Sequence, residues 1–377
     1  MPTPPAPIVF IDLKTQQARI RERVEARFAM VLDHGAYING PEVGELEQAL
    51  CDFTGARKAL AVANGTDALV MAMMAMELKR SDAVFIPAFT YNATASAVIL
   101  AGATPVFVDV RPGDFNIDPD DLERRVAAVR REGRLQPRLV LTVDLFGIPA
   151  DYQAIFGLAE KEGLQVLADA AQSFGARWNG RWAGDIAPVT ATSFFPSKAL
   201  ACYGDGGALM FRDTALWDAC EQIRWHGTDA ARKESVRVGF NGRLDSLQCA
   251  VVTEKLAIFE GELERRREIA AIYDGGLAGH VDPQAFAAGG ESGYGLYTVA
   301  IDRRDAVQSA LRNDGVPTAI YYSQPLHQMK AFAPYASGPM PESERLAGRV
   351  LSLPMHPYLS DEQAHHVVDR LIAALQA

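Results

Sequence analysis

The middle of the chain repeats one pattern, a short apolar run followed by a segment with helical spacing. The helical segments include Ala68–Leu78 and Asp151–Glu162. The apolar runs are Lys58–Ala63, Ala83–Pro87, Thr104–Val110, Arg138–Val143, Leu164–Ala168, Val189–Phe195 and Gly207–Phe211. Runs that are apolar throughout, rather than alternating with polar residues, are typical of strands buried on both faces. The pattern therefore predicts an α/β fold, with a mostly parallel sheet between two layers of helices.

The pattern changes after about Gly242. A charged stretch, Leu247–Tyr273, predicts a long helix or a helix pair, and a closing helix is expected from about Asp361. Two strands are expected between them, at Gly295–Ile301 and Pro317–Tyr322. A chain of 377 residues is also longer than a single core usually supports. We therefore expect a large domain at 1–250 and a smaller C-terminal α+β domain at 251–377.

Composition and charge exclude several classes of partner. The formal net charge is −10, so a nucleic-acid partner is not expected. No apolar run approaches the ~20 residues needed to span a bilayer, and the N-terminus lacks the pattern of a signal peptide. The four cysteines have no paired spacing, which argues against a disulfide framework or a zinc site. We expect a cytoplasmic protein without a bound metal or a membrane partner.

Polar residues follow three of the predicted strands. Asn64-Gly65-Thr66 comes between a strand and an apolar helix, where unpaired backbone N–H groups form a cup for phosphate. Gly65 would allow close approach of the ligand, and the Thr66 hydroxyl would add a hydrogen bond. An ordinary helix cap without a ligand is the simpler interpretation of this motif taken alone.

The other two strand ends carry an acid and a lysine. Asp169 can pair with a protonated ring nitrogen, although a turn aspartate is the simpler alternative. Lys198 lies among Phe194, Phe195 and Leu200, where desolvation would lower its pKa and free the amine for a Schiff base. A lone lysine is usually a solvated surface charge. Cup, acid and lysine follow one another in the order expected for a pyridoxal 5′-phosphate (PLP) site.

Longer motifs extend this interpretation over nearly the whole chain. They are ANGTDAL (63–69), PAFTYNATA (87–95), ADAAQSFGA (168–176), TSFFPSK (192–198) and YGDGGA (203–208). In this order and spacing the chain resembles the DegT/DnrJ/EryC1/StrS sugar aminotransferases. The resemblance implies the fold of fold-type I PLP-dependent transferases and an aminotransferase activity.

The resemblance also implies a role for each matching residue. Lys198 would carry the cofactor covalently, Asp169 would pair with the pyridine nitrogen, and Gln172 would contact the ring oxygen. Phe89 would stack on the ring. The phosphate would be held by Gly65, Thr66 and Ser193, and by Asn241 from a partner subunit. That last role implies a homodimer with shared active sites.

A narrower similarity concerns the acceptor. The run around Asn241 and Arg243 is similar to the branch that aminates C3 of nucleotide-linked 3-oxo sugars, with L-glutamate as donor. The expected acceptor is a UDP-linked 2-acetamido-3-oxo-glucuronate used for bacterial surface polysaccharide. Arg243, Tyr321 and His327 are the candidate substrate contacts, although Tyr321 stands where many relatives have histidine.

Three alternatives stay open from the sequence. The acceptor could be a dTDP-linked 3-oxo-6-deoxyhexose or a 4-oxo nucleotide sugar. The chain could instead be a PLP-binding regulator without turnover, which the complete set of Lys198, Asp169 and Gln172 argues against. A nicotinamide dehydrogenase is the third, and the absence of GxGxxG after the first strand counts against it.

Overall fold

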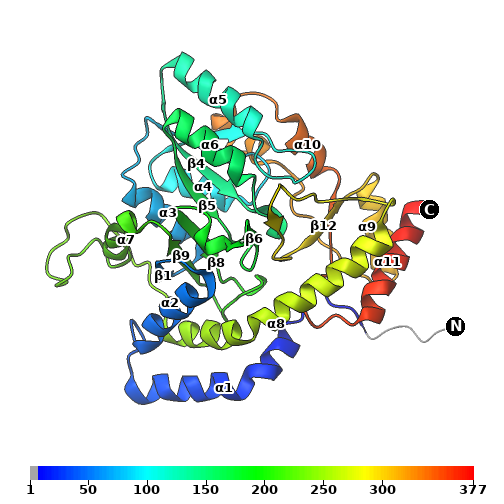
Figure 1. Cartoon of the computed structure of the whole chain (residues 1–377), viewed down its shortest axis with the longest axis horizontal. Coiled ribbons are helices and arrows are strands. Elements are labelled where there is room, and N and C mark those ends of the chain that lie inside the picture. The colour runs from blue at the N-terminus through cyan, green and yellow to red at the C-terminus, as the bar shows by residue number, and fades with distance from the viewer. Residues whose placement is uncertain (1–6) are drawn as a thin grey trace.

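The computed structural model describes residues 7–377 and is built around a seven-stranded sheet (Figure 1). Its strand order is β1-β9-β8-β5-β4-β2-β3. The strands are β1 (Lys58–Val62), β2 (Asp82–Pro87), β3 (Thr104–Val108), β4 (Gln136–Val143), β5 (Gln165–Asp169), β8 (Val189–Ser193) and β9 (Gly207–Phe211). Each corresponds to one of the predicted apolar runs, so all seven of those predictions are confirmed.

The direction of the strands gathers their carboxyl ends. Strands β8, β5, β4, β2 and β3 pair in parallel, and β9 is antiparallel to both β8 and β1. Strand β1 therefore runs in the same direction as β8. The residues that follow β1, β2, β5 and β8 thus meet at one edge of the sheet, which is where open α/β sheets bind ligands.

Helices cover both faces of this sheet. Strand β2 shows why its run is apolar throughout, since Val84 and Ile86 enter one core cluster while Ala83 and Phe85 enter another. The first cluster includes helix α3 (Gly65–Ala75), α4 (Ala93–Leu100) and α7 (Trp217–Arg224). The second includes α5 (Pro119–Glu132) and α6 (Tyr152–Glu162). The predicted α/β class with a mostly parallel sheet is confirmed.

A single helix, α8 (Ser246–Leu277), links the sheet domain to the C-terminal part of the chain (Figure 1). Its first half contributes Phe259 and Leu263 to the core beside the sheet. Its second half contributes Ile269 and Tyr273 to the C-terminal core. The helix runs unbroken past residue 250, so a domain boundary drawn there would divide it.

The C-terminal part contains a small sheet with strand order β10-β12-β13. Its elements are β10 (Asp282–Pro283), β12 (Tyr297–Ala300), α9 (Arg304–Asn313), α10 (Pro341–Ala347), β13 (Val350–Leu353) and α11 (Asp361–Gln376). The strand predicted at Gly295–Ile301 and the closing helix are confirmed. The strand predicted at Pro317–Tyr322 is wrong, because that segment makes only an isolated bridge between Ala319 and Ser352.

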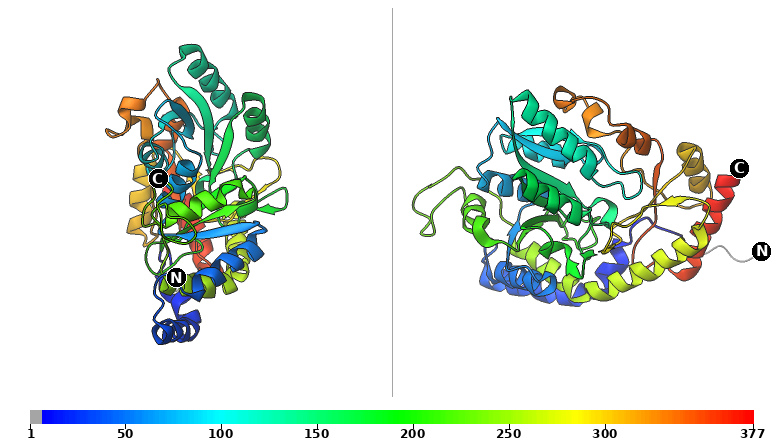
Figure 2. Two further views of the ribbon diagram at one scale, coloured as in Figure 1. Left: turned by 90° about the vertical axis from the view of Figure 1, so that its left-hand side faces the viewer. Right: turned by 45° about the horizontal axis from the view of Figure 1, so that its top comes forward.

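The N-terminal segment packs against α8. Helix α1 (Leu13–His34) places Ile20 and Val24 against Val251, and helix α2 (Pro41–Thr54) packs beside α8 as well. Figure 2 shows α1 and α8 together along one side of the molecule. The remaining strands, β6 (Arg177–Trp178), β7 (Arg181–Trp182) and β11 (Gly290–Glu291), form a third small sheet. Within residues 7–377, no helix is both long and apolar enough to cross a bilayer.

Candidate active site

A cavity of about 460 Å³ opens at the carboxyl ends of β1, β5 and β8. The predicted site residues in its lining are Gly65, Thr66, Asp169, Gln172, Ser193, Lys198 and Tyr321. The parallel sheet brings all of them except Tyr321 to one edge, and Tyr321 reaches the cavity from the C-terminal part of the chain.

One end of the cavity is the start of helix α3. Asn64 caps this helix, since its side chain accepts a hydrogen bond from the backbone N–H of Asp67 at 2.8 Å. The N–H groups of the first turn, including those of Gly65 and Thr66, have no partner within the helix. Gly65 lies so close to Ser193 that an added Cβ would be 2.8 Å from the Cβ of Ser193. This end is thus a cradle of backbone and hydroxyl donors suited to a phosphate.

Asp169 is the last residue of β5 and is buried. Burial raises the pKa of its carboxyl, while a hydrogen bond from the backbone N–H of Ala171 and the charge of Lys198 oppose this rise. The Ala171 bond is 3.0 Å long. A carboxylate with few other donors is well placed to accept a hydrogen bond from a protonated ring nitrogen.

Lys198 lies in the loop after β8, where its backbone N–H donates to the Phe195 carbonyl at 2.8 Å. Burial lowers the pKa of its amine, and the charge of Asp169 partly offsets that effect. A lowered pKa increases the fraction of neutral amine, which is the form that attacks a carbonyl carbon. Lysine and acid therefore face the same cavity from two neighbouring strands.

Gln172 joins the two parts of the molecule beside this acid. Its Oε1 accepts from the backbone N–H of Phe146 at 2.7 Å, and its Nε2 donates to the hydroxyl of Tyr322 at 2.9 Å. Phe146 belongs to the loop after β4, whereas Tyr322 follows α9 in the C-terminal part. The second N–H of this amide is the donor that remains for a ligand.

The aromatic wall of the cavity differs from the prediction. Phe89, expected to stack on the ring, is only 1% exposed and is not in the lining. It belongs to an internal cluster with Val143, because the backbone just after β2 still points that side chain into the core. Tyr91, two residues later, is 55% exposed and lines the cavity together with Tyr322. The stacking role predicted for Phe89 fits Tyr91 instead.

His327 lies away from the cavity. It is buried, and its Nε2 is 3.0 Å from Oε1 of Glu344 on α10. Its ring also packs near Phe107 in the core of the large domain. In this chain His327 is therefore a structural residue, and the predicted substrate contact is not supported.

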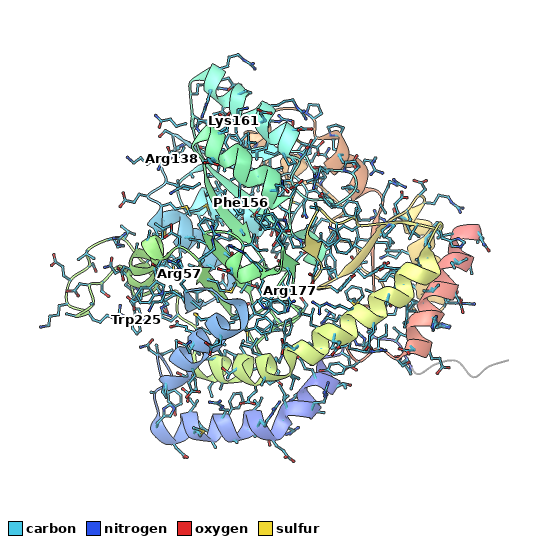
Figure 3. All side chains as sticks on the ribbon, viewed as in Figure 1. Arg57, Arg138, Phe156, Lys161, Arg177 and Trp225 are labelled. Carbon is cyan, nitrogen blue, oxygen red and sulfur yellow. The ribbon has the colours of Figure 1, made fainter. Side chains whose placement is uncertain are left out.

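Asn241 and Arg243 also lie outside the lining, beyond helix α7. Asn241 is exposed and pairs through its backbone with Trp225. The Arg243 guanidinium stacks over the Trp225 ring at 4.5 Å. Figure 3 labels Trp225 at the base of a projecting loop, residues 226–240. Within one chain these two residues do not reach the cavity.

Sequence reasoning missed Ile11, which reaches the cavity from the segment before α1. It also gave no role to Asp205, which lines the cavity from the glycine-rich turn before β9. Asp205 lies within the motif YGDGGA quoted for the resemblance, whereas Ile11 lies before all of the quoted motifs. Nothing in their residue type marks them as ligand contacts, so only the fold identifies them.

The cavity residues fit PLP. The Gly65–Ser193 cradle, which an added Cβ would fill, suits the phosphate, and Asp169 suits the ring nitrogen. Lys198 supplies an amine of lowered pKa for the covalent link. No cluster of residues suited to a metal ion occurs in the part of the chain that the structure describes.

Comparison with known proteins agrees with this assignment. The profile of the DegT/DnrJ/EryC1/StrS aminotransferase family matches residues 18–372. A UDP-2-acetamido-2-deoxy-3-oxo-D-glucuronate aminotransferase from Pseudomonas aeruginosa is 45% identical over 353 residues, 93% of this chain and 96% of the relative. The crystal structure of a DegT/DnrJ/EryC1/StrS aminotransferase from Brucella abortus is 44% identical with a TM-score of 0.94, covering 97% of this chain and 98% of its own. NtdA from Bacillus subtilis with bound cofactor PMP is 26% identical with a TM-score of 0.88, covering 100% of this chain and 87% of its own.

Proposed function

Because the chain belongs to the DegT/DnrJ/EryC1/StrS aminotransferase family, whose members use PLP, we propose that it transfers an amino group from L-glutamate to the C3 ketone of a nucleotide sugar. The acceptor we propose is UDP-2-acetamido-2-deoxy-3-oxo-D-glucuronate, and the product is a 3-amino sugar for bacterial surface polysaccharide. The observation that carries this choice is the 45% identity to the Pseudomonas enzyme over nearly the full length of both chains.

PLP, when bound, supplies a carbonyl carbon for the amino group and a ring that withdraws electrons from the reacting carbon. The residues of this chain hold that group and manage its protons. The first turn of α3 and the Ser193 hydroxyl bind the phosphate, and Asp169 keeps a proton on the ring nitrogen. Lys198 Nζ is the base that takes the proton from the α-carbon of the donor amino acid.

The proposed acceptor carries a diphosphate and a carboxylate, so its site needs positive charge. Among the described lining residues, Lys198 is the only lysine or arginine. Basic residues occur instead in the projecting loop, where Arg232 and Lys233 are exposed and Arg237 is half-buried, and Arg243 lies near its base. Two-point recognition of phosphate or carboxylate suits the fork of an arginine side chain.

We further propose a homodimer in which each cavity is completed by the second copy. In this arrangement the partner supplies Asn241 to the phosphate and Arg243 to the acceptor. The exposed apolar side chains of Tyr37, Ile38 and Val238 support it, because such side chains commonly become buried in an interface. We also assign the enzyme to the cytoplasm, which the unpaired state of its cysteines supports.

Mixing an inactive variant with a weakened one tests the shared site. A Lys198→Ala dimer lacks the amine, and an Asn241→Ala dimer has weakened phosphate binding. If Asn241 acts across the interface, a mixed dimer has one site in which both residues are intact, so activity reappears when the variants are mixed. Activity that never exceeds that of the Asn241→Ala dimer alone would show that Asn241 acts within its own chain.

The activity itself is tested by absorption spectroscopy of the purified holoenzyme. L-glutamate should bleach the visible band of the bound cofactor, and the UDP-linked 3-oxo uronate should restore it. A dTDP-linked 3-oxo-6-deoxyhexose and a UDP-linked 4-oxo sugar are the matched alternatives. Bleaching by glutamate with restoration by another acceptor would overturn the proposed substrate alone. A protein that binds no PLP would overturn the proposed function.

A further inference from the structure

A second carboxyl group lies directly behind Asp169. Asp144 follows the last residue of β4, the neighbour of β5 in the sheet, and its side chain is 0% exposed. Its backbone N–H donates to the carbonyl of Asp169 at 3.1 Å. Asp144 is not part of the cavity lining, so it has no direct contact with a ligand there.

Three donors converge on the Asp144 carboxyl. Oδ1 accepts from the backbone N–H of Ala150 at 3.0 Å and from the hydroxyl of Tyr152 at 2.9 Å. Oδ2 accepts from the hydroxyl of Ser173 at 3.0 Å. A fully buried acid is normally retained only with such partners, because an unpaired one is strongly destabilising.

These bonds hold the turn that presents the cofactor-recognition residues. The turn runs from Asp169 through Gln172 to Ser173, and Asp144 is bonded to it at both ends, through its backbone at Asp169 and through its carboxyl at Ser173. Between the two ends, Gln172 is fixed by the N–H of Phe146, two residues after Asp144. Hydrogen bonds from the loop after β4 thus fix the conformation of the loop after β5.

The charge of Asp169 also bears on Asp144. Burial raises the pKa of Asp144 to about 7, the three donors oppose the rise, and the nearby Asp169 increases it. The titratable groups that face Asp144 are Tyr152 from α6 and Asp169 from β5, and Asp169 in turn interacts with the charge of Lys198. Two acids that interact in a buried site influence each other's protonation reciprocally.

We propose that Asp144 is a positioning residue for the aminotransferase reaction, with two effects on Asp169. It holds the Asp169–Ser173 turn against the ring end of the cavity, and the charge of its carboxyl shifts the pH range over which Asp169 and the bound cofactor hold their protons. This inference rests on the proposed function in one respect only, the role of Asp169 opposite the cofactor ring.

Two variants separate the two effects. Asp144→Asn keeps the shape and removes the charge, since its Oδ1 can still accept from Ala150 and Tyr152 while Nδ2 donates to the Ser173 hydroxyl. Ser173→Ala keeps the charge and removes the bond to the turn. Tyr152→Phe is the matched control, because it also removes one hydroxyl donor to Asp144 but does not touch the turn.

The first measurement is thermal stability against pH, on the full chain without added PLP. An acid whose pKa is higher in the folded state is protonated there while the unfolded chain is ionised, so stability falls as pH rises from about 4, the ordinary aspartate value, to about 7. Asp144→Asn removes this penalty. We therefore expect its melting temperature, relative to the unmutated protein, to increase from pH 5 to about pH 7 and to level off above that. A constant difference over that range would contradict the proposed ionisation of Asp144.

The second measurement is the pH titration of the visible absorbance of bound PLP. Loss of a nearby negative charge destabilises positive charge on the cofactor, so Asp144→Asn should move the midpoint to lower pH by roughly one unit. Ser173→Ala and Tyr152→Phe each remove one hydroxyl donor to Asp144, so their midpoints should agree with each other. Ser173→Ala should weaken PLP binding on the order of tenfold, the typical effect of one lost hydrogen bond, whereas Tyr152→Phe should bind PLP normally. An unshifted midpoint in Asp144→Asn would overturn the electrostatic part, and normal PLP affinity in Ser173→Ala would overturn the positioning part. If the unmutated protein bound no PLP, the proposed function would fail, while the stability measurement would still report on Asp144.

Discussion

Replacing Gly65 with alanine should weaken PLP binding by filling the phosphate cradle. The new Cβ would lie 2.8 Å from Cβ, 3.3 Å from Cα and 3.4 Å from Oγ of Ser193. Gly65 does not have a positive φ, so the substitution adds a steric contact without backbone strain. Because carbon atoms normally approach to about 3.5–4.0 Å, the closest of these contacts is too short by about 1 Å.

The size of the loss in PLP affinity depends on whether Ser193 or the first turn of α3 shifts to relieve the contact. Ser193 is held in the sheet between β5 and β9, paired with Gly207, so the first turn of α3 has to shift instead. Overpacking of this kind costs about 1–3 kcal/mol. If that cost falls on the cradle, the dissociation constant of PLP should rise roughly 5- to 150-fold.

Fluorescence titration of cofactor-free protein with PLP measures this effect, and thermal melts without PLP show any cost to folding itself. Ser193→Gly removes the opposing Cβ, so the double variant with Gly65→Ala should bind PLP better than the two single effects predict together. If the two substitutions changed the free energy of PLP binding additively, Gly65 and Ser193 would not be in steric contact. Wild-type PLP affinity in Gly65→Ala would likewise contradict the predicted contact.

Three further predictions use residues outside the phosphate cradle. Tyr91→Ala should weaken PLP binding with little loss of stability, because Tyr91 is exposed at the cavity, whereas Phe89→Ala should destabilise the fold by about 3–5 kcal/mol in denaturant unfolding. Weakened PLP binding in Phe89→Ala, with normal binding in Tyr91→Ala, would show that Phe89 stacks on the ring after all. His327→Ala should lower the melting temperature and leave the KM for the sugar nucleotide unchanged, because His327 bonds to Glu344. A raised KM with unchanged stability would instead show that His327 contacts the substrate. Gly157→Ala, in the middle of α6 with no atom within 4 Å of the new Cβ, should stabilise the protein by about 0.5–1 kcal/mol, and destabilisation would argue against the described packing.

Much of the large domain could be predicted because one physical pattern specifies it. Residues such as Val84 and Phe85 are apolar in succession because both faces of the sheet are covered, and that pattern needs no information from distant parts of the chain. The C-terminal part depends on such information. The segment Pro317–Tyr322 has residues suited to a strand but bridges only at Ala319, because its neighbours are set by tertiary packing.

The same distinction separates the predicted site residues that line the cavity from Phe89, which does not. Asp169 ends β5, Gly65 begins the helix after β1, and Lys198 lies in the loop after β8, so their position at the cavity edge follows from strand direction. Phe89 and Tyr91 also follow a strand, but they lie only two positions apart. Which one faces the cavity depends on how the backbone turns after Pro87, and the sequence pattern does not record that turn.

Chemistry and recognition are therefore encoded in different parts of this chain. The groups that would bind the cofactor and move protons follow β1, β5 and β8, where any change of position would disturb the sheet. The remaining wall includes Ile11, Tyr321 and Tyr322, from the N-terminal segment and the C-terminal part. These segments are outside the sheet and can change without altering Lys198 or Asp169. A fold of this kind can keep one reaction while its acceptor sugar varies, which is why the reaction class can be read from short motifs and the acceptor from overall similarity to relatives.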